Sequence, residues 1–107
     1  MFGLFKKKDR QITVAQNKQV IEDNVKKLDS LFIVFDGREE ILAKLTELKT
    51  EYEFASPKEN ASSHKVDLKI GELLKDTELA AQRVMRGGSE TEVLTLIQRA
   101  RVEVTKR

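Results

Sequence analysis

The sequence predicts an all-α protein, an antiparallel three- to four-helix bundle, from three observations. Apolar residues recur at steps of three, four or seven along most of the 107 residues, which is the spacing of one helical face. Charged residues make up 36% of the chain and aromatic residues 6%, with one proline, a balance typical of helices with solvated outer faces. Helix start and stop signals separate the periodic segments.

The length and composition also predict the domain organisation. A chain of 107 residues can bury one hydrophobic core. We therefore expect a single helical domain over residues 12–107, preceded by a flexible segment of basic and apolar residues at 1–11.

The first predicted helix begins at Val14, and its apolar row breaks near its start. At Asn17 and Lys18 a core-facing position is polar. Either the first turns extend beyond the bundle or a polar residue fixes the helix register, and both interpretations stay open. The apolar row itself is Val14, Ile21, Val25, Leu28, Phe32 and Phe35.

Five consecutive apolar residues at the end of this helix are the best candidate for an interaction site. Such a run would point around the whole axis of a helix, so a short buried strand is an alternative. We favour a helix end that is buried on all sides or lies in an oligomer contact, because no partner strand follows. The candidate residues are Leu31, Phe32, Ile33, Val34 and Phe35.

The second helix is predicted from a capping signal and one apolar face. Asp36 is followed three residues later by Glu39, as in a capping box. The buried face is then predicted to contain Ile41, Leu45, Leu48 and Tyr52. Ser56 and Pro57 repeat the start signal, but the residues after them are polar and weakly helix-forming, so we predict a loop over 55–65.

Two further helices follow this loop. The third should end at Gly87 and Gly88, and Ser89 to Glu92 forms a second capping box that opens the fourth. Several core positions carry small residues, which bury little apolar area and favour self-association. The predicted core rows are Val66, Ile70, Leu73, Thr77, Ala80 and Val84, then Val93, Ile97, Ala100 and Val104.

The sequence offers no set of residues with catalytic spacing. It contains no cysteine, and His64 is its one histidine, which we expect to be solvated in the polar loop. A helical di-metal site needs Glu three residues before His, and that position is Ala61. Glu47 and Glu51 lie off the apolar stripe and indicate a solvated face. We therefore predict a protein that is not an enzyme and has no cofactor, metal or small-molecule substrate.

Apolar residues beside a basic run at the N-terminus suit an anionic membrane surface. The alternatives are a segment that packs on the end of the bundle and a disordered tail. The apolar stretch is too short for a signal peptide, so we expect a cytoplasmic protein, with peripheral binding to the inner face of the membrane as the alternative. The candidate membrane contacts are Phe2, Leu4, Phe5, Lys6, Lys7 and Lys8.

A basic C-terminal segment could contact phosphates, although it lacks interleaved aromatic residues and a recognition-helix pattern. Its cations are Arg99, Arg101, Lys106 and Arg107. The net charge of +2 is small, so weak nucleic-acid binding is the least favoured function. The function we predict is protein–protein interaction by coiled-coil-like helix packing, either as a homo-oligomer or as a subunit of an assembly.

Overall fold

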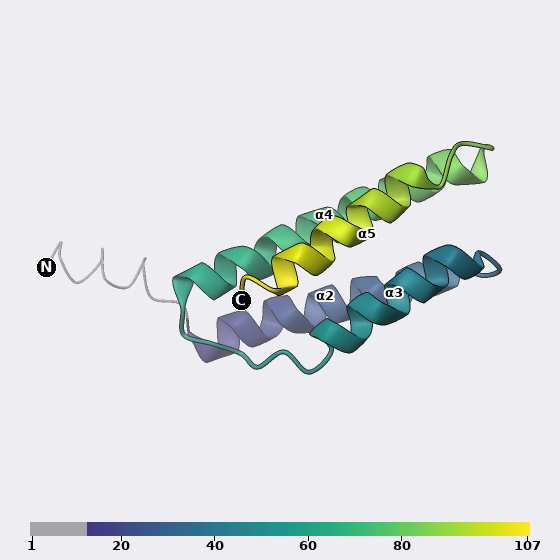
Figure 1. Cartoon of the computed structure of the whole chain (residues 1–107). Coiled ribbons are helices and arrows are strands. Elements are labelled where there is room, and N and C mark those ends of the chain that lie inside the picture. Colours follow the sequence, from purple (N-terminus) through teal and green to yellow (C-terminus); the bar gives the residue numbers. More distant parts are fainter. Residues whose placement is uncertain (1–12) are drawn as a thin grey trace, which may run out of the picture.

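Four α-helices make up most of the computed structural model, which describes residues 13–107 (Figure 1). No strand occurs in this part of the chain, so the prediction of an all-α protein is confirmed there. The helices are α2 (Val14–Val34), α3 (Glu39–Tyr52), α4 (Ala61–Met85) and α5 (Thr91–Val104).

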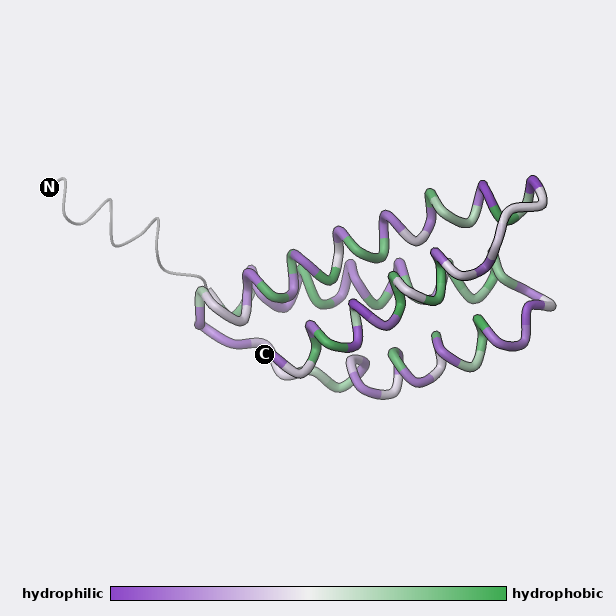
Figure 2. Tube along the Cα trace, turned by 45° about the horizontal axis from the view of Figure 1, so that its top comes forward, coloured by the Kyte–Doolittle hydropathy of each residue, from purple (hydrophilic) through white to green (hydrophobic). Residues whose placement is uncertain are grey.

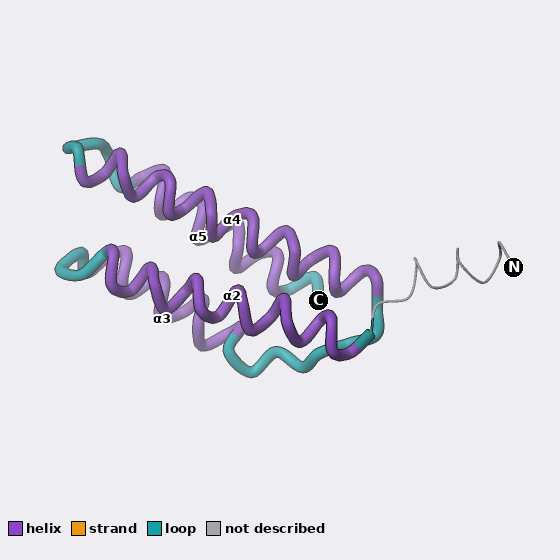
Figure 3. The backbone as a smooth tube through the Cα atoms, turned by 180° about the vertical axis from the view of Figure 1, so that it is seen from behind, coloured by secondary structure: helices purple, strands orange, loops and turns teal. Residues whose placement is uncertain are grey.

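The helices form two hairpins that lie side by side. Short turns join α2 to α3 and α4 to α5, so each of these pairs runs in opposite directions (Figure 1). Between the hairpins, α2 packs against α4 and α3 packs against α5, and the two helices of each of these pairs run in the same direction. The linker over 53–60 therefore joins two helices that lie diagonally across the molecule (Figure 3).

The start of α2 is fixed by a capping box that the sequence analysis missed. The Thr13 Oγ1 accepts a hydrogen bond from the Gln16 backbone N at 3.1 Å, and the Gln16 Oε1 accepts one from the Thr13 backbone N at 2.9 Å. These bonds satisfy two backbone N–H groups that a helix start leaves without partners.

The two predicted capping boxes do not form. Asp36 lies in a tight turn whose Gly37 has a φ of +85°, and α3 begins only after Arg38, with no side-chain cap. The Ser89 Oγ accepts a hydrogen bond from the backbone N of Thr91, while Glu92 forms an ion pair with Arg83 on α4. A tight turn therefore replaces the capping box predicted at Asp36, and an ion pair between helices replaces the one predicted at Ser89.

The helix α4 is longer than predicted. It begins at Ala61 because the Asn60 Oδ1 caps it by accepting a hydrogen bond from the Ser62 backbone N at 2.8 Å. The prediction of a loop over 55–65 is therefore wrong after Asn60. The predicted stop is confirmed: Gly87 has a φ of +94°, and the Gly88 N donates to the Arg83 carbonyl at 2.9 Å.

The core confirms some predicted faces and corrects others. The α3 face is buried as predicted, whereas Val14 on α2 is exposed and does not belong to the core. On α2 the buried row is Asn17, Ile21, Asn24, Leu28 and Leu31, followed by Phe35. Figure 2 shows the resulting alternation of hydrophobic and hydrophilic residues along each helix. Within residues 13–107, no helix is apolar and long enough to cross a lipid bilayer.

The apolar run at the end of α2 is helical, so the strand alternative is wrong. Residues 31–34 form its last turn, and Phe35 follows as the C-cap. Leu31 and Phe35 are fully buried, but Ile33 is 79% exposed and Val34 39%. At 100° per residue, Ile33 points away from the side that Leu31 and Phe35 occupy. A helix end buried on all sides is thus also wrong for the single chain.

Candidate functional site

A network of buried polar side chains occupies the end of the molecule where α2 and α4 begin. Its centre is Asp67 on α4, whose side chain is fully buried. We call the set of hydrogen-bonded side chains around it the Asp67 network, and it consists of Asn17, Asn24, Tyr52, Asp67 and Arg107.

The strongest contact in the Asp67 network is an ion pair with Arg107. The Arg107 Nε donates to the Asp67 Oδ1 at 2.7 Å, and the Arg107 Nη2 donates to the Oδ2 at 2.9 Å. The Arg107 side chain is only 9% exposed. The hydrogen bond to Asp67 raises the pKa of the guanidinium, and the two-point geometry is the one in which arginine binds carboxylates most specifically.

Two side chains connect this ion pair to α2 and α3. The Tyr52 hydroxyl donates to the Asp67 Oδ1 at 2.9 Å and accepts a hydrogen bond from the Asn24 Nδ2 at 3.0 Å. The Asn24 Nδ2 also donates to the Asp67 backbone carbonyl at 2.8 Å. The neighbouring residue on α4 is Gly71, where an added Cβ would lie 2.7 Å from the Asn24 Oδ1. Glycine therefore permits the close approach of α2 and α4.

Asn17 connects the Asp67 network to the linker. Its Nδ2 donates to the Asp67 Oδ2 at 2.8 Å and lies 3.3 Å from the His64 Nδ1. Its Oδ1 accepts a hydrogen bond from the Lys58 backbone N at 2.9 Å. Asn17 is fully buried, so of the two interpretations of the polar break in α2, the structure supports a polar residue that fixes register.

His64 occupies a different place from the one predicted. It lies in the first turn of α4 and is half-buried against Asn17, so its assignment to a solvated loop is wrong. The correction follows from the early start of α4 at Ala61.

The hydrogen bonds that the Asp67 carboxylate accepts favour a structural role for the network. Each carboxylate oxygen accepts two hydrogen bonds, Oδ1 from Tyr52 and Arg107 and Oδ2 from Asn17 and Arg107. Among the described residues, every buried side-chain nitrogen and oxygen has a hydrogen-bond partner. A general base must reach a proton on a substrate, and a carboxylate that is fully buried and fully bonded does not offer that reach.

The phenol of Tyr52 provides a direct test of this burial. Burial raises the pKa of Tyr52 well above its usual value of 10.0, and the hydrogen bond from Asn24 opposes that rise in part. Because the unfolded chain ionises near pH 10.0 and the folded chain does not, the stability from the buried phenol is complete below pH 10.0 and falls as the pH rises further.

We expect the free energy of unfolding to fall above that pH, by at most about 1.4 kcal/mol per pH unit from this group. Denaturant unfolding at a series of alkaline pH values measures the slope. Tyr52 is the only tyrosine, so the ultraviolet absorbance of tyrosinate reports its ionisation directly. Tyr52→Phe removes the contribution, and an equal slope in that variant would show that Tyr52 does not cause it.

Most cations of the basic C-terminal segment bind acids of the same chain. Arg101 on α5 contacts Glu47 and Glu51 on α3, with its Nη1 2.7 Å from the Glu47 Oε2. The glutamates are exposed, as predicted for a solvated face, but they also join two helices. The Lys106 Nζ lies 2.6 Å from the Glu103 Oε2, and Arg107 binds Asp67. Three of the four cations proposed to contact phosphates are thus neutralised, which weakens the case for nucleic-acid binding.

The predicted interaction residues divide into a buried and an exposed set. Leu31 and Phe35 belong to the core, and Phe32 is half-buried with the Lys49 Nζ 5.7 Å from its ring centroid. Ile33 and Val34 remain on the surface. The candidate membrane contacts at Phe2, Leu4, Phe5 and Lys6–Lys8 lie outside the described residues, so membrane binding stays a prediction.

No protein family, curated protein or solved structure matches the chain. Among residues 13–107, no group of three or more histidine, aspartate or glutamate side chains is placed to hold a metal ion.

Sequence reasoning missed most of the Asp67 network. Asn17 was recognised as a polar core position, but Asn24, Asp67 and Arg107 were not singled out together. The available signal was the spacing of Asn17 and Asn24, which are seven residues apart and alternate with Ile21 and Leu28 on the buried face of α2. Two polar residues at successive heptad positions indicate a polar layer in a helical core.

Proposed function

We propose that the chain is a non-enzymatic helical-bundle protein that acts by protein–protein contact and self-associates through Ile33 and Val34. The observation that carries the proposal is the exposure of Ile33, which is 79%, within a helix turn whose other side is fully buried. The sequence predicts an antiparallel bundle, and the antiparallel pairing within each hairpin supports it, whereas α2 with α4 and α3 with α5 are parallel pairs.

A twofold contact makes good use of such a surface. In a symmetric dimer the same patch of each chain meets its counterpart, so both copies of each apolar residue are buried in one interface. Full burial of an isoleucine or valine stabilises by about 1.5–3 kcal/mol relative to exposure. Met85, the last residue of α4, is 55% exposed at the same end of the molecule and can extend the contact.

The test is the oligomeric state over a wide range of protein concentration, measured by analytical ultracentrifugation. We expect the natural chain to dimerise and the double variant Ile33→Ser and Val34→Ser to weaken the dimer by about a hundredfold or more, because four apolar side chains lose their burial.

The matched control is the double variant Leu68→Ser and Leu79→Ser. These two residues are 47% and 49% exposed on α4, so the control also removes two exposed apolar side chains. It should dimerise as the natural chain does. A natural chain that stays monomeric throughout, or a control that weakens dimerisation equally, would contradict the proposal.

A further inference from the structure

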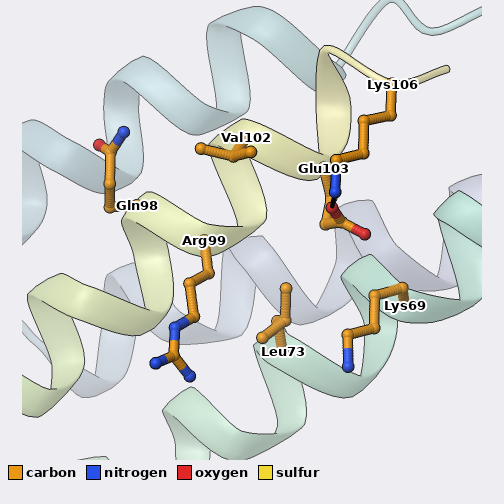
Figure 4. Close-up of a pocket in the computed structure, with 7 residues that line it drawn as sticks. All are labelled: Lys69, Leu73, Gln98, Arg99, Val102, Glu103 and Lys106. Carbon is orange, nitrogen blue, oxygen red and sulfur yellow. Dashed lines mark ion pairs between the residues drawn. The ribbon is translucent and has the colours of Figure 1, made fainter.

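A groove lies between α4 and α5, at the end of the molecule that holds the Asp67 network (Figure 4). Its volume is about 430 Å³. Its apolar part comes from Leu73 on α4, which is only 5% exposed, and from Val102 on α5, which is 45% exposed. The lining residues span Lys69 to Leu73 on α4, about 6 Å or one turn, and Gln98 to Glu103 on α5, about 8 Å.

Cations flank the apolar part of this groove on both helices. Lys69 belongs to α4, and Arg99 and Lys106 come from α5 and the turn after it, against one lining acid, Glu103. In Figure 4 the side chain of Leu73 lies between those of Arg99 and Lys69. The groove is therefore apolar along its middle and positively charged at its edges.

Of these cations, Arg99 is the one most available to a ligand. Lys106 is held by Glu103, with its Nζ 2.6 Å from the Glu103 Oε2, and Lys69 lies 3.8 Å from the exposed Glu72. Within residues 13–107, Arg99 forms no ion pair. Its side chain extends from α5 toward Leu73 on α4 (Figure 4), and an arginine without an acid partner there can hold a carboxylate of a ligand.

We propose that this groove binds an amphipathic helix of another protein, one that carries an apolar stripe flanked by acidic residues. A helix laid between two helices contacts them through residues at i, i+3 and i+4, and the turn of α4 and the turn of α5 that line the groove match that spacing. Its flanking carboxylates would meet Arg99 on one side and Lys69 on the other.

The groove is independent of the self-association proposed above. It lies on α4 and α5, whereas Ile33 and Val34 lie at the far end of α2. Loss of one binding activity therefore leaves the other intact, and the two proposals fail separately.

The experiment uses a synthetic helical peptide with leucine at i, i+3, i+4 and i+7 and glutamate on both sides of the leucine stripe. Its binding to the full chain is followed by fluorescence anisotropy. We expect saturable binding that Arg99→Glu weakens by about tenfold or more, because an attractive charge contact becomes repulsive. Val102→Asp should weaken binding similarly by placing a charge in the apolar contact.

Lys75→Glu is the matched control variant. Lys75 is exposed on α4 outside the groove, and its reversal changes the net charge by the same amount as Arg99→Glu. Binding should stay within about twofold of that of the natural chain, since distant exposed charges are screened. A second control is a peptide of the same composition with its leucine stripe scrambled, which should not bind.

Three results would overturn the proposal. The first is no saturable binding of the acidic peptide. The second is an equal loss of binding in Lys75→Glu, or equal binding of the scrambled peptide, because either would reduce the effect to general charge attraction. The third is binding of phosphatidylserine vesicles that depends on Arg99 while the peptide does not bind, which would assign the groove to a lipid.

Discussion

Replacing Arg107 by methionine is expected to lower the free energy of unfolding by about 3 kcal/mol, because the change leaves the buried Asp67 carboxylate without its counter-ion. Asp67 is fully buried and Arg107 is 9% exposed, so water cannot take the place of the guanidinium without opening the network. Urea denaturation at neutral pH, followed by far-ultraviolet circular dichroism, measures the difference.

Lys106→Met is the matched control for this prediction. Lys106 is adjacent in sequence, but its side chain is 58% exposed and its ion pair with Glu103 joins neighbouring turns of the chain end. Its loss should cost less than about 1 kcal/mol. Adding Asp67→Asn to Arg107→Met should recover part of the lost stability, since it removes the uncompensated charge. If Arg107→Met is as mild as Lys106→Met, the ion pair does not contribute as the structure indicates.

The second large effect concerns Gly71→Ala, whose effect on the free energy of unfolding should change sign when Asn24 is also replaced. In the natural chain, Gly71→Ala should destabilise by about 1 kcal/mol, although alanine forms helices better than glycine. The new Cβ would lie 2.7 Å from the Asn24 Oδ1, so Asn24 must move away from Tyr52 and from the Asp67 carbonyl. The loss of these hydrogen bonds outweighs the gain in helix propensity.

In an Asn24→Ala background the obstacle is absent, and the same Gly71→Ala change should stabilise by about 0.5–1 kcal/mol. Thermal and urea unfolding of the four proteins gives the coupling energy of the pair by a double-mutant cycle. Equal effects of Gly71→Ala in both backgrounds would show that Asn24 does not limit the approach of α2 to α4.

The sequence predicted best where one periodic pattern decides the structure. The face of α3 that holds Ile41, Leu45, Leu48 and Tyr52 is buried as predicted, because four apolar residues at helical spacing leave one way to face a core. The end of α4 shortly before Gly87 was also predictable, because few residues other than glycine adopt the positive φ that Gly87 has.

The predictions failed where tertiary contacts outweigh local signals. The residues around His64 lack apolar periodicity, yet they are helical because Asn60 caps them and Ser63 and Asp67 are buried by neighbouring elements. Asp67 and Arg107 are 40 residues apart, so no local spacing connects them. The exposure of Ile33 could not be predicted either, because an unbroken run of five apolar residues does not indicate which of them face the core.

The linker between α3 and α4 forms hydrogen bonds with residues of the Asp67 network that are far away in the sequence, and these bonds bear on the order of folding. Its Lys58 N–H is bonded to Asn17, and its Ser56 carbonyl accepts a hydrogen bond from Arg107, so partners 41 and 51 residues apart meet there. Each hairpin can form from contacts between neighbours in the chain, and the Lys58 bond to Asn17 needs only α2 and the linker. The bonds from Arg107 to Ser56 and from Asn17 to Asp67 require both hairpins to have docked. We therefore expect these bonds between the hairpins to form late in folding, so that their loss mainly speeds unfolding.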